Sequence, residues 1–235
     1  MKIKYLAHSG FLVETAEHIL VFDYFRGELI LPDNGKTVVF FVSHIHDDHY
    51  NPVIYEHSGR EDTYYVLSEE IGDFSDHAAV TRVCPDAEYD VGGTHIKTLR
   101  STDCGVAYLV NADGETIYHA GDLHLWVWDG RSGLGNKLAE MRFRAEIEKL
   151  RGIVIDAAFL PLDPRQGADG TLGFDYTVRT LDIKYAFPMH FWGRPEYVEM
   201  FCKSPDAIPY RDRIVPLTKE GREVTLPTGE SIGDK

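Results

Sequence analysis

Three histidines and two aspartates stand within six consecutive positions of this chain, at residues 44–49. They follow an apolar run at residues 37–43 whose composition is typical of a buried strand. Each such side chain has to be hydrogen-bonded, hydrated or bound to another group, because burying a polar group without a partner is unfavourable. Alternate residues that leave a strand, here His44 and His46, can direct two imidazoles at one point. We therefore interpret the cluster as part of a metal site rather than as a solvated loop.

Two later segments end in the same way, with an apolar run followed by a residue that can bind a metal. Asp122 follows a strand-like run and a glycine turn, and His190 follows the run at residues 185–189. Taken alone, Asp122 would be a turn residue and His190 a buried core histidine. With the first cluster they form a set of imidazole and carboxylate groups, which suits zinc, manganese or iron, whereas calcium prefers oxygen ligands. We predict one or two divalent ions, with zinc as the first choice and manganese or iron as alternatives.

These motifs resemble those of the metallo-β-lactamase-fold hydrolases. The match consists of the H-x-H-x-D-H motif at residues 44–49, the Gly-Asp motif at residues 120–122 and the last histidine at residues 188–190. Residues 8–14 and 118–122 are most similar to the branch that contains the ascorbate-6-phosphate lactonase and many uncharacterised metal-dependent hydrolases. The resemblance implies an α/β (α+β) fold, a four-layer αββα sandwich in which two mixed sheets carry helices on both outer faces.

The resemblance also implies a role for each matching residue. In the family pattern, two histidines bind a first ion, two other histidines and an aspartate bind a second ion, and another aspartate bridges both ions together with a hydroxide. In this chain the corresponding residues are His44 and His46, then Asp48, His49 and His190, and finally the bridging Asp122. We name Asp48 and Asp122 as the catalytic residues, and Asp48 is also our candidate for passing a proton to the leaving group.

One element of the family pattern is missing. The first ion normally takes a third histidine, but the corresponding segment at residues 98–106 contains none. Asp103, a hard oxygen ligand, is our candidate for its replacement. The alternatives are Ser101 or Thr102 acting through water, and Cys104 as a softer ligand. A site of two histidines and one aspartate favours manganese or iron more than a site of three histidines does. The remaining alternative is that the first ion has been lost.

Three residues near the expected ligands are candidates for substrate binding. Trp192 follows the last ligand and is our choice for a pocket wall, although large aromatic residues more often belong to a core. Arg165 follows a predicted strand and can hold a carboxylate or phosphate as a fork, unless it pairs with Asp163 or Asp169 instead. His124 stands two residues after the bridging aspartate and is the third candidate.

The composition restricts the partners of the chain. Its formal charge of −14 over 235 residues argues against broad binding to nucleic acid or to an anionic membrane, which both require clustered lysine and arginine. The three cysteines form no C-x-x-C pair, and no apolar stretch approaches the roughly 20 residues that span a bilayer. We expect a cytoplasmic protein that acts on a small molecule, without nucleic acid or membrane partners. The oligomeric state stays open between a monomer and a homo-oligomer.

The order of the predicted elements indicates one domain over residues 1–235. Short strands come first, at residues 3–7, 11–14, 19–23, 38–43, 63–67, 96–99, 106–110 and 116–119. Strands at residues 153–160 and 185–189 then alternate with helices at residues 138–150, 176–181 and 196–201. A further helix is expected after Asn51, which is placed to cap it, and long loops are expected at residues 27–35 and 163–173.

Our leading hypothesis from the sequence is a metal-dependent hydrolase in which a metal-bound hydroxide attacks a small ester, lactone or phosphate-containing substrate. One alternative is a metal-dependent phosphodiesterase or nuclease, which the acidic composition disfavours. The other alternative is a non-catalytic metal-binding sensor, which the missing histidine keeps open.

Overall fold

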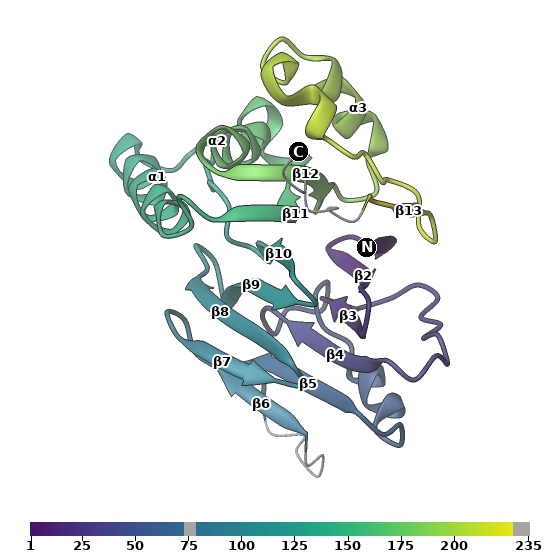
Figure 1. The fold of residues 1–235 in the computed structure, drawn as a ribbon. Helices are drawn as coiled ribbons and strands as arrows, with labels where there is room; N and C mark the ends of the chain where they lie inside the picture. Colours follow the sequence, from purple (N-terminus) through teal and green to yellow (C-terminus); the bar gives the residue numbers. More distant parts are fainter. Residues whose placement is uncertain (73–78, 228–235) are drawn as a thin grey trace.

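The computed structural model describes residues 1–72 and 79–227, and within them two β-sheets form the centre of the molecule (Figure 1). In the described ranges the first sheet has the order β13-β1-β2-β3-β4-β5-β6. Its strands are β1 (Lys2–Ala7), β2 (Gly10–Glu14), β3 (His18–Phe22), β4 (Thr37–Val42), β5 (Thr63–Ser68), β6 (Val80–Val83) and β13 (Glu223–Thr225). The second sheet has the order β12-β11-β10-β9-β8-β7. Its strands are β7 (Glu88–Val91), β8 (Thr94–Arg100), β9 (Val106–Ala112), β10 (Glu115–His119), β11 (Val154–Pro161) and β12 (Asp182–Met189).

Both sheets are mixed, and their parallel parts decide where the polar residues gather. In the first sheet β3, β4, β5 and β6 are parallel, whereas β1, β2 and β3 are joined by antiparallel pairs. In the second sheet β10, β11 and β12 are parallel. Parallel neighbours end at the same edge of a sheet, and β1 runs in the direction of β3 because two antiparallel pairings separate them. The residues after β1, β3 and β4 therefore share one edge, and those after β10, β11 and β12 share another.

The main hydrophobic core lies between the two sheets. Phe22 of β3 stacks on Phe41 of β4 at 4.8 Å between ring centroids, and Phe11 of β2 meets Phe159 of β11 at 4.3 Å. A second apolar cluster covers the other face of the first sheet, where Phe40 packs on the far side of β4. Because β4 is buried on both faces, its sequence is a continuous apolar run rather than an alternating one.

Helices complete the sandwich on both sides. The segment η1 (Pro52–His57) packs against the outer cluster of the first sheet through Ile54. On the other side, α2 (Leu172–Thr180) lies beside β11 and β12, and α1 (Gly133–Glu148) packs against α2 (Figure 1). The remaining helical segments are η2 (Pro164–Thr171), α3 (Pro195–Lys203) and η3 (Ile208–Arg213). The predicted four-layer arrangement is confirmed. Across residues 1–72 and 79–227, no helix has the length and apolar character that crossing a bilayer would require.

Several element boundaries differ from the prediction for local reasons. Helix α1 begins earlier than expected because the Ser132 side chain caps it, accepting a hydrogen bond from the Gly135 backbone N–H at 3.1 Å. Residues 163–173, expected to be a loop, contain η2, since Asp163 accepts from the Arg165 backbone N–H at 2.8 Å and a proline opens the helix. The strands β6, β7 and β13 were not predicted, because each is short and polar at half or more of its positions.

The second sheet touches the first directly at Ser43, the residue between β4 and the histidine cluster. The Val106 backbone N–H donates to the Ser43 carbonyl at 3.0 Å. A Cβ placed on the preceding Gly105 would lie only 2.0 Å from that carbonyl oxygen and 2.7 Å from the His44 Cβ. Glycine at this position therefore allows the contact that sets the start of the histidine cluster.

We expect Gly105→Ala to destabilise the fold strongly. The residue has a φ of +67°, which alone costs an alanine about 1–2 kcal/mol, and the clash with Ser43 adds about 1–3 kcal/mol. Gly114→Ala is the matched control, because Gly114 has a φ of +79° and open space around it. Chemical denaturation should show a clearly larger loss of unfolding free energy for Gly105→Ala. Equal losses for the two variants would contradict the close contact.

Candidate metal centre

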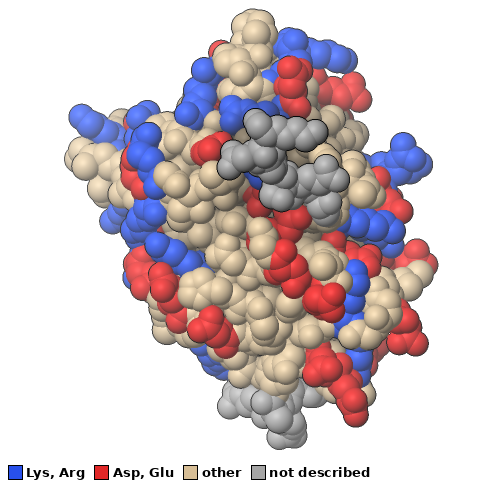
Figure 2. Space-filling view, in the orientation of Figure 1, with Lys and Arg blue, Asp and Glu red and all other residues tan. Residues whose placement is uncertain are grey.

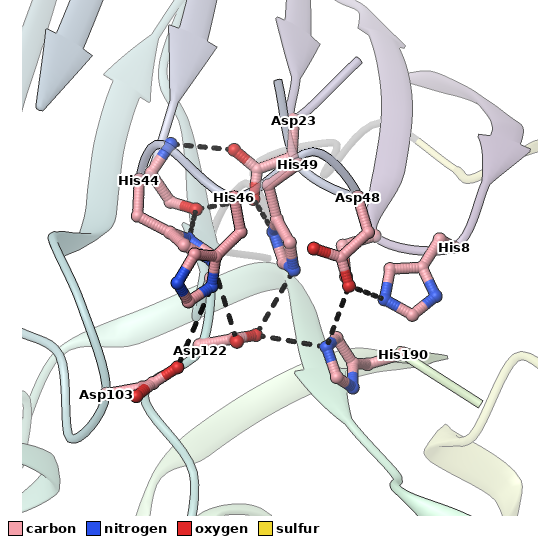
Figure 3. Close-up of polar contacts among 12 residues, drawn as sticks. His8, Asp23, His44, His46, Asp48, His49, Asp103, Asp122 and His190 are labelled. Carbon is pink, nitrogen blue, oxygen red and sulfur yellow. Dashed lines mark hydrogen bonds and ion pairs between the residues drawn. The ribbon is translucent and has the colours of Figure 1, made fainter. Parts of the chain in front are cut away.

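The predicted ligands meet where the edges of the two sheets come together (Figure 3). His44 follows β4, Asp122 follows β10 and His190 follows β12. Figure 3 shows Asp122 and His49 in the middle of the cluster, with His44, His46 and Asp103 to one side. Ligand atoms lie within 4.8 Å of one another in four sets, namely His44, His46 and Asp48; His44, His49 and Asp122; His8, Asp48, His49 and His190; and His46, Asp103 and Cys104.

Asp122 is the shared neighbour of the buried histidines. Its Oδ1 lies 3.3 Å from Nε2 of His49 and 3.3 Å from Nε2 of His190, while its Oδ2 lies 3.6 Å from Nε2 of His44. The same Nε2 of His190 also lies 4.0 Å from Oδ2 of Asp48. The carboxylate of Asp122 thus faces both ends of the cluster, which is the placement that a bridging ligand requires.

Asp103 lies at the open end of the cluster. Its Oδ2 is 3.9 Å from Nδ1 of His46, and both side chains are nearly half exposed. Burial and the charge of Asp122 raise the pKa of the Asp103 carboxyl above its usual value. The hydroxyls of Ser101 and Thr102 are occupied within the fold, because Ser101 accepts from the Asp103 backbone N–H and Thr102 donates to the His124 carbonyl. The candidate replacement ligand is therefore close to the cluster, and its role stays a prediction.

Asp23 orients the buried imidazoles from behind. It follows β3 and accepts hydrogen bonds from the Ser43 backbone N–H at 2.7 Å, the Ser43 hydroxyl at 2.6 Å and Nδ1 of His49 at 2.7 Å. Since the Ser43 hydroxyl donates to Asp23, it is free to accept from Nδ1 of His44 at 2.9 Å. Both histidines are thereby held with Nε2 facing Asp122, the arrangement that carboxylates behind a metal site usually impose.

Asp163 does the same for His190. Its fully buried carboxylate lies 3.1 Å from Nδ1 of His190, so that Nε2 of this ring also points to Asp122. Burial raises the pKa of Asp163, but hydrogen bonds from His190 and Arg165 outweigh this and hold it well below the usual value. The carboxylate is therefore charged and can support the imidazole.

The arrangement fits a divalent cation. Nε2 of His44, Nε2 of His49 and Oδ1 of Asp122 are buried and make no hydrogen bond with any residue in the ranges 1–72 and 79–227. Buried polar atoms in folded proteins are almost always paired, so three orphaned atoms that face one point indicate a missing partner with positive charge. Imidazole nitrogens and a carboxylate oxygen are the donors that zinc and other first-row ions take.

The backbone is held in an unusual conformation around the cluster. His8, Asp23, His190 and Trp192 all have φ values between 42° and 59°, a region that residues other than glycine rarely adopt. Each such residue costs about 1–3 kcal/mol and persists only where the surrounding structure holds it. Here the His190 backbone N–H donates to the His8 carbonyl at 3.1 Å, which joins the end of β12 to the end of β1.

A cavity of about 400 Å³ opens in front of the cluster. Part of its lining consists of metal-site residues, namely His46, Asp48, Asp103, Asp122 and His190. The lining also includes Trp126, Trp128, Trp192, Arg131 and Arg165. The three tryptophans surround the Arg165 guanidinium, whose Cζ lies 4.3 Å from the Trp192 ring centroid and 5.8 and 5.9 Å from those of Trp128 and Trp126. Metal ligands and aromatic side chains therefore share one space.

The three predicted substrate residues have different positions. Trp192 is 43% exposed and lines the cavity. Arg165 also lines it but makes the predicted alternative contact, a salt bridge to Asp163 in which Nε and Nη2 both donate. His124 is corrected: its ring is 1% exposed, packs edge-on against Trp126 at 4.9 Å and is not part of the cavity lining. The turn after Asp122 directs this side chain into the protein interior.

Sequence reasoning missed Asp23 and Asp163 as supporting residues and gave His8 no role as a ligand. Each of them follows an apolar strand, β3, β11 and β1 respectively. This is the pattern that drew attention to Asp122 and His190, and it would have marked all three as candidates without showing what each of them contacts. His119 lies behind the site, with Nε2 2.8 Å from the Ser9 carbonyl.

Comparisons with known proteins agree with this geometry. A family model described as "Beta-lactamase superfamily domain" matches residues 2–128, more than half of the 235 residues. A UPF0173 metal-dependent hydrolase from Thermococcus kodakarensis is 26% identical over 210 residues, which cover 81% of this chain and 84% of the relative.

Solved structures show the same fold at low sequence identity. Igni18, a metallo hydrolase from Ignicoccus hospitalis, superposes with a TM-score of 0.70 at 18% identity, over 97% of this chain and 99% of its own. The metallo-β-lactamase fold protein YhfI from Bacillus subtilis superposes with a TM-score of 0.55 at 12% identity, over 81% and 86% of the two chains.

Metal binding should release a proton from His49. Burial lowers the pKa of this imidazole, but the Asp122 and Asp23 carboxylates outweigh burial and raise it to about 10. Burial lowers the pKa of His44 to about 4, so His44 has no proton to lose near neutrality. Since a ligating imidazole has to be neutral, we expect about one proton to be released when the ion next to His49 binds at about pH 7, and the affinity for that ion to rise about tenfold per pH unit towards pH 10. Calorimetry in buffers of different ionisation enthalpy measures this release, and identical heats would contradict it.

Asp23→Asn should weaken metal binding by roughly 10–100-fold, because one carboxamide oxygen cannot replace a carboxylate that accepts from Ser43 and His49. Asp113→Asn is a matched control away from the site. Asp113 also accepts from a backbone N–H, a hydroxyl and a histidine. Equal metal affinities for the two variants, measured by competition with a chromophoric chelator, would show that Asp23 does not support the site.

Proposed function

Because the chain belongs to the β-lactamase superfamily and is a metal-dependent hydrolase, we propose that it cleaves a small ester, lactone or phosphate-containing molecule in the cavity beside the metal centre. The proposed ligands are His44, His46, Asp48, His49, Asp103, Asp122 and His190. Zinc is the proposed metal, with manganese or iron as alternatives, since nitrogen and oxygen donors are combined. Within the superfamily we propose the branch of the ascorbate-6-phosphate lactonase, on the similarity of residues 8–14 and 118–122.

One observation carries this proposal. Asp122, which carries one of the orphaned atoms, lines the cavity together with four other proposed ligands, so a molecule in the cavity lies against the proposed metal site. A non-catalytic sensor needs no such open space next to its metal. Trp192, with 43% of its surface exposed, gives the cavity an apolar face against which a small organic molecule can pack.

A bound divalent ion supplies the chemistry that carboxylates and imidazoles lack, because it makes water acidic near neutral pH and polarises a carbonyl or phosphoryl oxygen. Asp48 lines the cavity and is positioned to take a proton from water and pass it to a leaving group. Burial raises the pKa of Asp48, but His8, His49 and His190 outweigh burial and hold it well below the usual value. The carboxylate is therefore charged near neutral pH, as a metal ligand has to be.

Arg131 is the residue best placed to bind an anionic part of the substrate. It lines the cavity, and within the described part of the chain no carboxylate lies within 4.0 Å of its guanidinium. Its Nη1 donates to the Trp126 carbonyl at 3.3 Å. Arg165 is less available because Asp163 already occupies its fork. The substrate that fits is a small carboxylate or phosphate with an apolar or ring portion for Trp192.

A small molecule is a better candidate than nucleic acid. The formal charge is −14, and on the face shown in Figure 2 lysine and arginine side chains alternate with aspartate and glutamate instead of forming a continuous basic band. An enzyme that follows a phosphate backbone would be expected to carry such a band.

Turnover of a panel of lactones, esters, phosphomonoesters and phosphodiesters by the metal-loaded protein tests the proposal. Asp122→Asn should reduce kcat by at least about 100-fold, because it removes the charge that faces both ends of the cluster. Arg131→Ala should raise KM for anionic substrates roughly 10–100-fold with little change in kcat, as expected for a lost charge-assisted hydrogen bond. Arg151→Ala, at an exposed arginine paired with Glu148, serves as the control. Wild-type turnover no greater than that of Asp122→Asn for every compound would refute catalysis.

A further inference from the structure

His8 lies beside the metal cluster although no ligand motif includes it. It occupies the turn between β1 and β2, and its side chain is 6% exposed. Nε2 lies 3.2 Å from Oδ2 of Asp48, but the geometry does not make a hydrogen bond, and the atom has no other partner. A buried ring nitrogen that points at a carboxylate without bonding to it needs another explanation.

The position of His8 matches that of a ligand. Its ligand atom lies within 4.8 Å of those of Asp48, His49 and His190, so the four residues can surround one ion. Its ring is 4.2 Å from that of His190 and 5.6 Å from that of His49, between centroids. Figure 3 shows the Asp48 carboxylate next to both His8 and His190, at the end of the cluster opposite Asp103.

The fold holds His8 in this position. Its φ of 53° is rarely adopted by residues other than glycine, and the His190 backbone N–H donates to its carbonyl at 3.1 Å. Edge-on contacts with Trp192 at 4.9 Å and Phe25 at 5.9 Å enclose the ring. The same backbone link therefore places both His8 and His190 next to Asp48.

We propose that His8 is an additional ligand of the ion at the Asp48 end of the cluster. The inference rests on the proposed function only in requiring that the cluster binds metal. With His8, this position has three imidazoles and one carboxylate, a complete tetrahedral set for an ion such as zinc. The opposite position has the buried His44, but its other ligands are His46 and Asp103, whose side chains are 3.9 Å apart and nearly half exposed. The chain accordingly binds one ion tightly next to His8 and a second ion more weakly next to Asp103.

Titration of the metal-free, full-length protein with Zn²⁺ and Co²⁺ tests this asymmetry. His8→Asn is the informative variant, because asparagine tolerates a positive φ but is too short to replace the imidazole. We expect it to weaken the tighter class of sites at least tenfold and to reduce the visible absorption of the Co²⁺ form. Asp103→Ala should weaken only the looser class. His95→Ala removes an exposed histidine that contacts Asp90 and should change neither class.

The position of the ion separates a ligand from a neighbour that merely supports Asp48. In a crystal structure of the Zn²⁺ form, anomalous density about 2.0–2.1 Å from Nε2 of His8 supports the proposal. An ion that stands beyond hydrogen-bonding distance of His8, with the tighter class unaffected in His8→Asn, overturns it. These measurements use no substrate, so ligation by His8 without any turnover would refute the proposed hydrolysis alone. An active enzyme whose tight ion does not contact His8 would refute this inference alone.

Discussion

The site depends most on the hydrogen bonds that the Asp23 carboxylate accepts. It accepts hydrogen bonds from the backbone and hydroxyl of Ser43 and from His49. Through Ser43 it also determines which nitrogen of His44 faces the cluster. One fully buried side chain thus connects the end of β3 to the end of β4 and decides the direction of two imidazoles. Without it, both rings would be free to present the wrong nitrogen, and a short motif of histidines would not amount to a site.

Close contact between the two sheets brings Asp122, on the second sheet, up to the histidines that Asp23 orients. Ser43 lies under Gly105 and Gly121, where a Cβ on Gly121 would come within 2.7 Å of the Ser43 Cβ. The absence of side chains there lets the segment after β10 pass directly over the end of β4, so that Asp122 reaches His44 and His49. The position of the shared carboxylate is therefore a result of sheet packing as much as of its own loop.

How far the sequence predicts this site depends on how local each signal is. His44 and His46 were recognisable because their spacing and the buried strand before them lie within one short segment. Asp23 follows a strand just as clearly, but a lone aspartate after a strand is common, and only its partner 26 residues away reveals its role. His124 illustrates the opposite error, because its distance from Asp122 along the chain says nothing about the direction of its ring. The short strands β7 and β13 were not predicted because their own sequences carry little strand signal. They form by pairing with the neighbouring strands β8 and β1, respectively.

The two contacts of Asp163 connect the cavity wall to the metal centre. This carboxylate is shared between Arg165, which faces the cavity, and His190, which faces the cluster. A bound anion that drew Arg165 away would leave the whole charge of Asp163 to His190 and make that imidazole a stronger donor. Occupancy of the cavity and retention of metal are then linked equilibria, and each would change the other by the same factor. The wall that selects the substrate would in this way also regulate how firmly the enzyme keeps its ion.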